Sequence, residues 1–166
     1  MTQETKRKLT IIGVVAGVEI AFGVIEGIIM PNLFERKKGD PFFLPDAAGI
    51  AKIGGTLIAT GVVSGVVCDY VLEKWKVKDE NRAKVITMVA IGLNVVETVL
   101  TYNINKKFDK DFSVTLPKVS EFAPAFVFLC LTSIVGGYAS DNLISGLLPV
   151  DTRPIIGEEE LLADKM

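Results

Sequence analysis

Residues 9–30, with the sequence LTIIGVVAGVEIAFGVIEGIIM, decide the fold class of this chain. The run has about the length that an α-helix needs to cross the hydrocarbon core of a bilayer, roughly 20 residues. It nevertheless contains two carboxylates, Glu19 and Glu26. Because seven residues are close to two helical turns, both side chains fall on nearly the same face of the helix. The stretch therefore predicts a transmembrane helix with one acidic face, which is a starting point for a functional hypothesis.

The composition of the whole chain is typical of a polytopic membrane protein. Of its 166 residues 49% are hydrophobic, its mean hydropathy is positive, and its apolar residues gather into a few long runs. The net charge of -2 comes without an extended basic tract, so we expect no nucleic acid partner. The absence of His argues against His-ligated haem, His-containing zinc sites and His-based proton relays.

Three further apolar runs follow the first one, at residues 47–72, 83–102 and 122–148. Together the four runs predict an all-α fold, a bundle of four transmembrane helices that forms a single membrane domain over residues 1–166. Polar loops are predicted at residues 31–46 and 103–121, a charged connector at residues 73–84, and a short acidic tail at residues 149–166.

Small residues and prolines add detail to the first predicted helix. Pro31 and Asn32 are expected to end it. Two pairs of glycines spaced four residues apart, Gly13 with Gly17 and Gly23 with Gly27, are expected either to admit a neighbouring helix closely or to reflect only the usual composition of membrane helices.

An internal repeat relates the second and fourth runs. Placing residues 60–72 over residues 132–144 aligns Thr60 with Thr132, Gly65 with Gly137 and Asp69 with Asp141. The first and third runs correspond more loosely, with Val18-Glu19 against Val96-Glu97. Two repeated hairpins would be related by an axis along the membrane normal, whereas chance similarity between glycine- and valine-rich helices is the competing explanation.

The distribution of lysine and arginine predicts the orientation. With four spans, the N-terminus, the connector and the tail lie on one side, and this side carries more cations than the side of the two polar loops. The positive-inside rule then places both termini in the cytoplasm, for a protein integral to the cell membrane.

Polar side chains within the predicted helices form a candidate ion or proton pathway: Glu19, Glu26, Lys52, Asp69, Asn94, Glu97 and Asp141. From the helical rise, Glu19 and Asn94 are expected near the midplane and the two aspartates near the cytoplasmic boundary. An isolated charge at the centre of a helix costs about 2.5 to 3.5 kcal/mol, so these groups must be paired, protonated or in contact with water.

The charges nearer the outer boundary do not balance. Lys52 can neutralise one of Glu26 and Glu97, which leaves one carboxylate in excess. At the midplane Glu19 has only Asn94 as an evident partner, and an amide does not cancel a charge. We therefore expect Glu19 to be protonated at neutral pH, or to meet a cation or a water-filled cavity.

Two interpretations of these polar groups stay open. In the first they carry protons or hard cations such as sodium, calcium or magnesium, which prefer oxygen ligands. In the second they hydrogen-bond between helices and hold the bundle or an oligomer together. Cys68 and Cys130 fall at different expected depths, so we predict two buried thiols rather than a disulfide.

The sequence accordingly gives two functional expectations. The first is a small membrane transport protein or channel for cations or protons, forming a homo-oligomer or part of a membrane complex. The second is a non-catalytic structural or accessory subunit of a larger membrane assembly or an enveloped particle. We expect no enzyme activity, no catalytic residues, no cofactor and no bound metal centre, because no base or phosphate-binding loop accompanies the serines and glycines.

Overall fold

The computed structural model describes the backbone of residues 2–35, 38–108 and 119–148. Within these ranges it also describes the side chains, except at residues 34–35, 48–50, 52–53, 97–108 and 119–122. The described chain is all-α, as predicted. Its elements are α1 (Gln3–Met30), the short π-helix η1 (Pro31–Glu35), α2 (Ala47–Lys74), α3 (Asp79–Phe108) and α4 (Val119–Leu147).

The helices are longer than the apolar runs that predicted them. α1 begins at Gln3 instead of residue 9, because the side chain of Thr2 caps it by accepting a hydrogen bond from the Thr5 amide at 3.2 Å. α3 runs from Asp79 to Phe108 instead of over residues 83–102, so the predicted loop at residues 103–121 begins inside a helix. Backbone hydrogen bonding continues past the point at which the side chains become polar, and the hydropathy pattern does not detect this continuation.

The chain does not leave helical structure directly at the end of α1. The α-helix ends before Pro31, as predicted, but the chain continues through the π-turns of η1. There the Asn32 side chain donates to the Ile28 carbonyl at 2.7 Å and to the Phe43 carbonyl at 2.9 Å, and it accepts from the Phe43 amide at 2.7 Å. A single amide side chain thus ties the segment before α2 to the end of α1.

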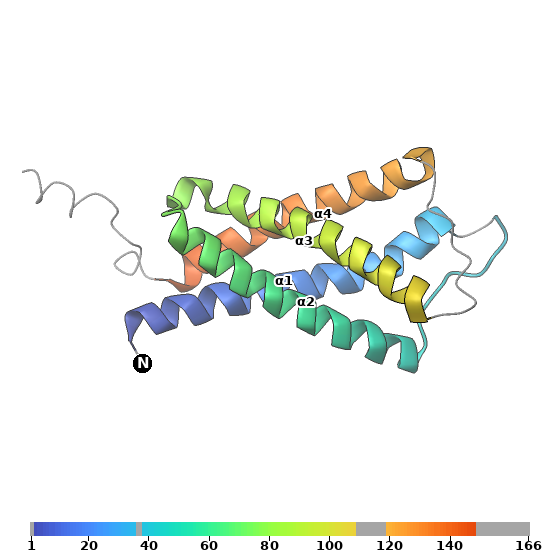
Figure 1. Ribbon diagram of the computed structural model, residues 1–166, viewed down its shortest axis with the longest axis horizontal. Coiled ribbons are helices and arrows are strands. Elements are labelled where there is room, and N and C mark those ends of the chain that lie inside the picture. The colour runs from blue at the N-terminus through green and yellow to red at the C-terminus, as the bar shows by residue number, and fades with distance from the viewer. Residues whose placement is uncertain (1, 36–37, 109–118, 149–166) are drawn as a thin grey trace, which may run out of the picture.

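The four helices run roughly along the long axis of the molecule, with neighbours in sequence antiparallel (Figure 1). α1 packs most extensively on α2, and α3 packs on α4; the two hairpins meet through α1 with α4 and to a smaller extent through α2 with α3. We call the end that holds the start of α1 and the turn at residues 75–78 the connector end, and the end that holds residues 38–46 the loop end.

The hydrophobic core lies in the half of the bundle at the connector end. It consists of Ile11, Val15, Cys68, Leu72, Val85, Ile86, Ile144 and Leu148. By contrast, none of the described side chains at residues 17–33, 54–60, 91–96 and 123–132 is buried. The bundle is therefore tightly packed at one end and loosely packed at the other.

Two glycines, one in α2 and one in α4, lie against the backbone of a neighbouring helix. A methyl group added at Gly65 would come within 2.6 Å of the Ile12 carbonyl oxygen, and one added at Gly137 would meet both the Thr87 side chain and the Ala83 carbonyl. For Gly13 and Gly17, which the sequence offered either as sites of close packing or as ordinary membrane-helix composition, no described atom of another helix lies within 4 Å of such a position. Contacts among the described residues therefore do not use that pair.

Three helical segments are long and apolar enough to cross a membrane, counting only the described residues: Gln3–Leu33, Gly54–Lys74 and Ala123–Leu147. Large apolar side chains such as Val62 and Val66 on α2, and Leu131 and Val135 on α4, are exposed on the outside of the bundle. Such a surface suits a lipid bilayer rather than water, which indicates an integral membrane protein.

Candidate functional site

The loosely packed half of the bundle contains a cavity of about 760 Å³ that is lined by all four helices. α1 contributes Glu19, Phe22 and Glu26, and α3 contributes Asn94. The polar side chains that α2 and α4 add to the lining are hydroxyls: Thr56, Thr60, Ser64, Thr132 and Ser133. The cavity therefore combines two carboxylates, an amide and several hydroxyls within an otherwise apolar wall.

Glu26 is held by the neighbouring fourth helix. The Thr132 hydroxyl donates a hydrogen bond to the Glu26 carboxylate, and both side chains are half-buried. This contact joins α1 to α4 across the cavity. A hydrogen bond from a hydroxyl favours the charged form of a carboxylate less than a cation does, so the contact positions Glu26 without neutralising it.

Asn94 is anchored in a similar way from the other side. Its side-chain amide donates to the Ser133 hydroxyl at 3.3 Å, which joins α3 to α4. Ser133 is itself buried, whereas Asn94 is half-buried and faces the cavity. The adjacent residues Thr132 and Ser133 thus fix one polar group from each hairpin.

Glu19 lies at the end of the cavity lining that is nearest the start of α1. One turn before it, Val15 and Ala16 are buried, and Ala16 lies against Gly61 of α2. Glu19 and Glu26 are seven residues apart in one helix, so they are separated by about 10.5 Å along its axis. The two carboxylates therefore spread negative charge along the length of the cavity instead of concentrating it at one point.

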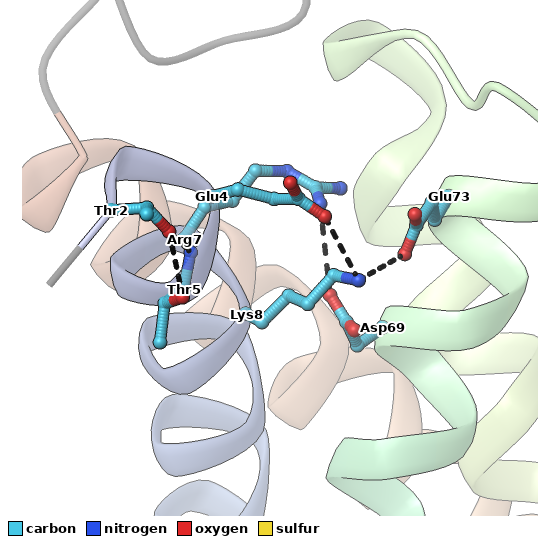
Figure 2. Close-up of polar contacts among 7 residues, drawn as sticks. All are labelled: Thr2, Glu4, Thr5, Arg7, Lys8, Asp69 and Glu73. Atoms are coloured by element: carbon cyan, nitrogen blue, oxygen red, sulfur yellow. Dashed lines mark hydrogen bonds and ion pairs between the residues drawn. The ribbon is translucent and has the colours of Figure 1, made fainter.

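At the connector end, ionic contacts join the first hairpin (Figure 2). The Arg7 guanidinium lies 3.8 Å from Asp69 Oδ1, which is within range of an ion pair but too long for a hydrogen bond, and that oxygen is buried without a hydrogen-bond partner. Lys8 bridges Glu4 at 3.2 Å and Glu73 at 3.1 Å. The start of α1 is thereby held against the end of α2.

A stronger network joins the second hairpin at the same end. Arg82 of α3 donates from Nε to Asp141 at 2.5 Å, from Nη1 to Asp79 at 2.9 Å and from Nη2 to the Ser145 hydroxyl at 2.5 Å. The Arg82 side chain is only 9% exposed. Such a charge is tolerated at a buried position because several polar groups surround it.

The structure thus divides the candidate pathway residues into groups. Glu19, Glu26 and Asn94 come together on the cavity wall. Asp69 and Asp141 lie instead at the connector end, each beside an arginine. The side chains of Lys52 and Glu97 lie outside the described residues, so the expected pairing of Lys52 with a glutamate stays a prediction.

Several functional groups were not anticipated from the sequence. Arg7 and Arg82 entered the prediction only as cations that set the topology, because their partners are some sixty residues away in the chain. Thr132 entered only through its alignment with Thr60 in the internal repeat, and Ser133 was not singled out, since isolated hydroxyls are common in membrane helices. A search for polar residues on the apolar fourth run would have found both.

Among the described residues no three side chains of the Cys, Asp and Glu type come together to hold a metal ion. No protein-family model matches the sequence, and no curated protein or solved structure is significantly similar to it.

Proposed function

We propose that this chain is a small integral membrane transport protein for cations or protons, in which carboxylates inside the bundle form the pathway. The observation that carries the proposal is the cavity between the four helices, with Glu19 and Glu26 on its wall and Asn94 beside them. Carboxylates in a membrane bundle are costly unless they meet water, a cation or a proton, and a cavity of this size provides the space for any of these.

In the proposed orientation all four helices cross the membrane. α3 is added to the three helices that are long and apolar enough by themselves, α1, α2 and α4. α3 packs along α4 and contacts α2, and its charged residues before Val85 lie at the connector end, where the headgroups of the lipids would begin. Both termini and the turn at residues 75–78 would then be cytoplasmic, in agreement with the distribution of lysine and arginine. The loop end would face the opposite side of the cell membrane.

In this orientation each polar residue has its own proposed role in transport. Glu19 is the central site for a proton or cation, Asn94 is a neutral ligand nearby, and Glu26 marks the outer mouth, to which the sequence also assigns Lys52 and Glu97. Asp69 and Asp141 mark the inner end of the pathway. Each lies beside an arginine at the connector end, which supports a state of the protein that is closed towards the cytoplasm.

We further propose that the hairpins α1–α2 and α3–α4 are repeats of one ancestral unit. Asp69 and Asp141 occupy aligned positions, and each lies beside an arginine from the first helix of its own hairpin. The aligned glycines Gly65 and Gly137 likewise both contact the backbone of that first helix. Chance similarity between apolar helices would not be expected to preserve contacts of both kinds.

These contacts also favour a different alignment of the first helix with the third. The sequence comparison had placed Glu19 over Glu97. The spacing that relates Arg7 to Arg82 also relates Ile11 to Ile86, both of which are almost completely buried. The same spacing aligns Glu19 with Asn94 instead of with Glu97. The two halves would then contribute a carboxylate and an amide, respectively, at corresponding positions of one cavity.

The alternative function, an accessory subunit of a larger membrane complex, is favoured by a different observation. Gly13 and Gly17 lie on an exposed face of α1, and no atom from the part of the chain that the structure describes packs on them from another helix. In membranes such a pair allows the close approach of another helix, which here would belong to a second copy or to a partner subunit.

The experiment that tests transport is ion and proton flux into liposomes that contain the purified protein, comparing the unaltered chain with Glu19→Gln. Glu80→Gln, at an exposed position outside the cavity, is the matched control. We expect flux to be lost in Glu19→Gln and kept in Glu80→Gln, with the same oligomer size for all three proteins. Absence of flux from the folded unaltered protein, or loss of assembly in Glu19→Gln, would favour the accessory subunit instead.

A further inference from the structure

The cavity is far larger than an inorganic cation requires. Its volume of about 760 Å³ lies within the range of roughly 300 to 1,000 Å³ that is usual for sites that bind organic molecules. A single water molecule, by comparison, takes up about 30 Å³. Space of this kind is suited to a ligand with a substantial body of its own.

The arrangement of the carboxylates is unsuited to a single metal ion. Ligand oxygens lie about 2.3 to 2.6 Å from a bound calcium ion, whereas Glu19 and Glu26 are separated by about 10.5 Å along α1. The two glutamates therefore offer two separate points of negative charge along the cavity. An extended ligand can place its positive charge at one of them while the rest of the molecule occupies the space between.

The wall between the two carboxylates is largely apolar. Phe22 lies between them in the sequence of α1, and Leu57, Val63, Leu93 and Leu129 line the cavity from the other helices. The Phe22 ring extends towards α4, where a methyl group added at Gly136 would lie 3.7 Å from it. An aromatic face attracts cations, and aliphatic side chains favour an apolar ligand body.

Glu19 is better placed than Glu26 to hold the charge of such a ligand. It lies at the end of the cavity lining nearest the buried residues Val15 and Ala16, and an ionic contact is stronger close to an apolar core than in water.

We propose that the cavity binds an organic cation with an apolar body, with Glu19 as its charge partner and Phe22 as part of the apolar wall. The proposal rests on the proposed transport function and names the class of substrate. A proton would compete for the same carboxylate, so binding of the organic cation should weaken as the pH falls.

The test is equilibrium binding of radiolabelled tetraphenylphosphonium to the purified protein in detergent, with protein-free micelles as the blank. We expect saturable binding that acid reverses and that tetraphenylborate, an anion of the same shape, does not compete for. Glu19→Gln should weaken binding at least roughly tenfold, because it leaves the cation without its charge partner. Glu80→Gln should leave binding unchanged.

Two further variants keep the test decisive if Glu19→Gln does not fold. Glu19→Asp retains the charge and should bind within a few-fold of the unaltered protein. Ala59→Phe adds bulk at an exposed position on the cavity wall, and it should weaken tetraphenylphosphonium binding while Glu19 is unaltered. Equal binding by the unaltered protein and Ala59→Phe would contradict the proposed site.

The remaining outcomes separate this proposal from the transport function. Flux of protons or inorganic cations without any binding of tetraphenylphosphonium would contradict the proposed organic-cation site, but it would agree with the proposed transport function. Binding that depends on Glu19 in a protein that shows no flux would overturn transport and retain the binding site. Binding that Glu19→Gln does not change in a folded protein would show partition into detergent, and would overturn the proposal.

Discussion

The two arginines at the connector end differ in how strongly their surroundings hold them. Arg82 makes three hydrogen bonds and its side chain is 9% exposed, whereas Arg7 approaches Asp69 only to 3.8 Å and is 17% exposed. A buried charge whose partner is removed is strongly destabilised, whereas a partly solvated one recovers much of its hydration. The two pairs therefore offer a direct comparison within one molecule.

For this reason Asp141→Asn should destabilise the protein more than Asp69→Asn. We expect a loss of about 2 kcal/mol for Asp141→Asn, since Asp79 and Ser145 still contact Arg82, and less than about 1 kcal/mol for Asp69→Asn. The measurement is the unfolding midpoint in mixed micelles of increasing SDS content. Equal losses would show that the shorter contact of Arg82 contributes no additional stability.

Glycines give a second comparison at the scale of single residues. Gly65→Ala would force a methyl group against the Ile12 carbonyl, so α1 and α2 would have to separate. We expect it to cost about 1 to 3 kcal/mol. Gly13→Ala meets no atom within 4 Å and should leave stability unchanged or raise it by up to about 1 kcal/mol.

The same SDS titration measures both variants, and both should be examined at a concentration where the oligomer size is known. A large loss in Gly13→Ala would mean that another helix packs on that face, as the accessory-subunit interpretation requires. A small loss in Gly65→Ala would mean that the hairpin tolerates a wider separation than its backbone contact implies.

At the scale of elements, Asn32 connects the end of α1 to the segment before α2. Asn32→Ala removes three hydrogen bonds at once, two of them to the backbone of Phe43. Each such bond is worth about 1 kcal/mol, so the segment should detach more often by roughly tenfold or more. Phe42 and Phe43 are exposed, so chymotrypsin can report the change.

We therefore expect chymotrypsin to cleave between α1 and α2 faster in Asn32→Ala than in the unaltered protein. Asn142→Ala, at an exposed position of α4, is the control and should not alter the rate. An unchanged rate in Asn32→Ala would indicate that other contacts hold this segment in place.

The helices themselves were largely predictable, and their ends were not. An apolar run of this length favours a helix, so four runs gave four helices in the predicted order. α1 has six additional residues at its start, and α3 has six at its end. They depend on local capping and on backbone hydrogen bonds, which hydropathy does not measure. The π-turns after Pro31 depend on a contact with Phe43 that no local pattern reveals.

The candidate site was predictable in part for a related reason. Glu19, Glu26 and Asn94 are conspicuous because polar residues are rare in apolar runs, and all three line the cavity. Asp69 and Asp141 were expected near the boundary on the side of the connector, but their arginine partners come from other helices and were not predicted. Spacing along one helix identifies a face, but only packing identifies what that face contacts.

At the scale of the whole molecule, the difference in packing between the two ends should be measurable with the native cysteines. Cys68 is 1% exposed within the core, whereas Cys130 is half-buried in the loosely packed half. We expect N-ethylmaleimide to modify Cys130 at least roughly tenfold faster than Cys68 in detergent, because Cys68 reacts only when the core opens. The single-cysteine variants Cys68→Ala and Cys130→Ala assign the two rates, and similar rates would contradict a core confined to the connector end.

The closeness of α1 to α2 has a consequence for how the protein is made. The backbone contacts of Gly61 and Gly65, together with the bridge from Lys8 to Glu73, lie wholly within residues 3–74. During synthesis on the ribosome this pair of helices can associate in the membrane before α4 has been translated. The second pair, whose Arg82 needs Asp141 and Ser145 from α4, has to wait, and until then Arg82 depends on Asp79. The first hairpin would therefore serve as the template on which the second one assembles.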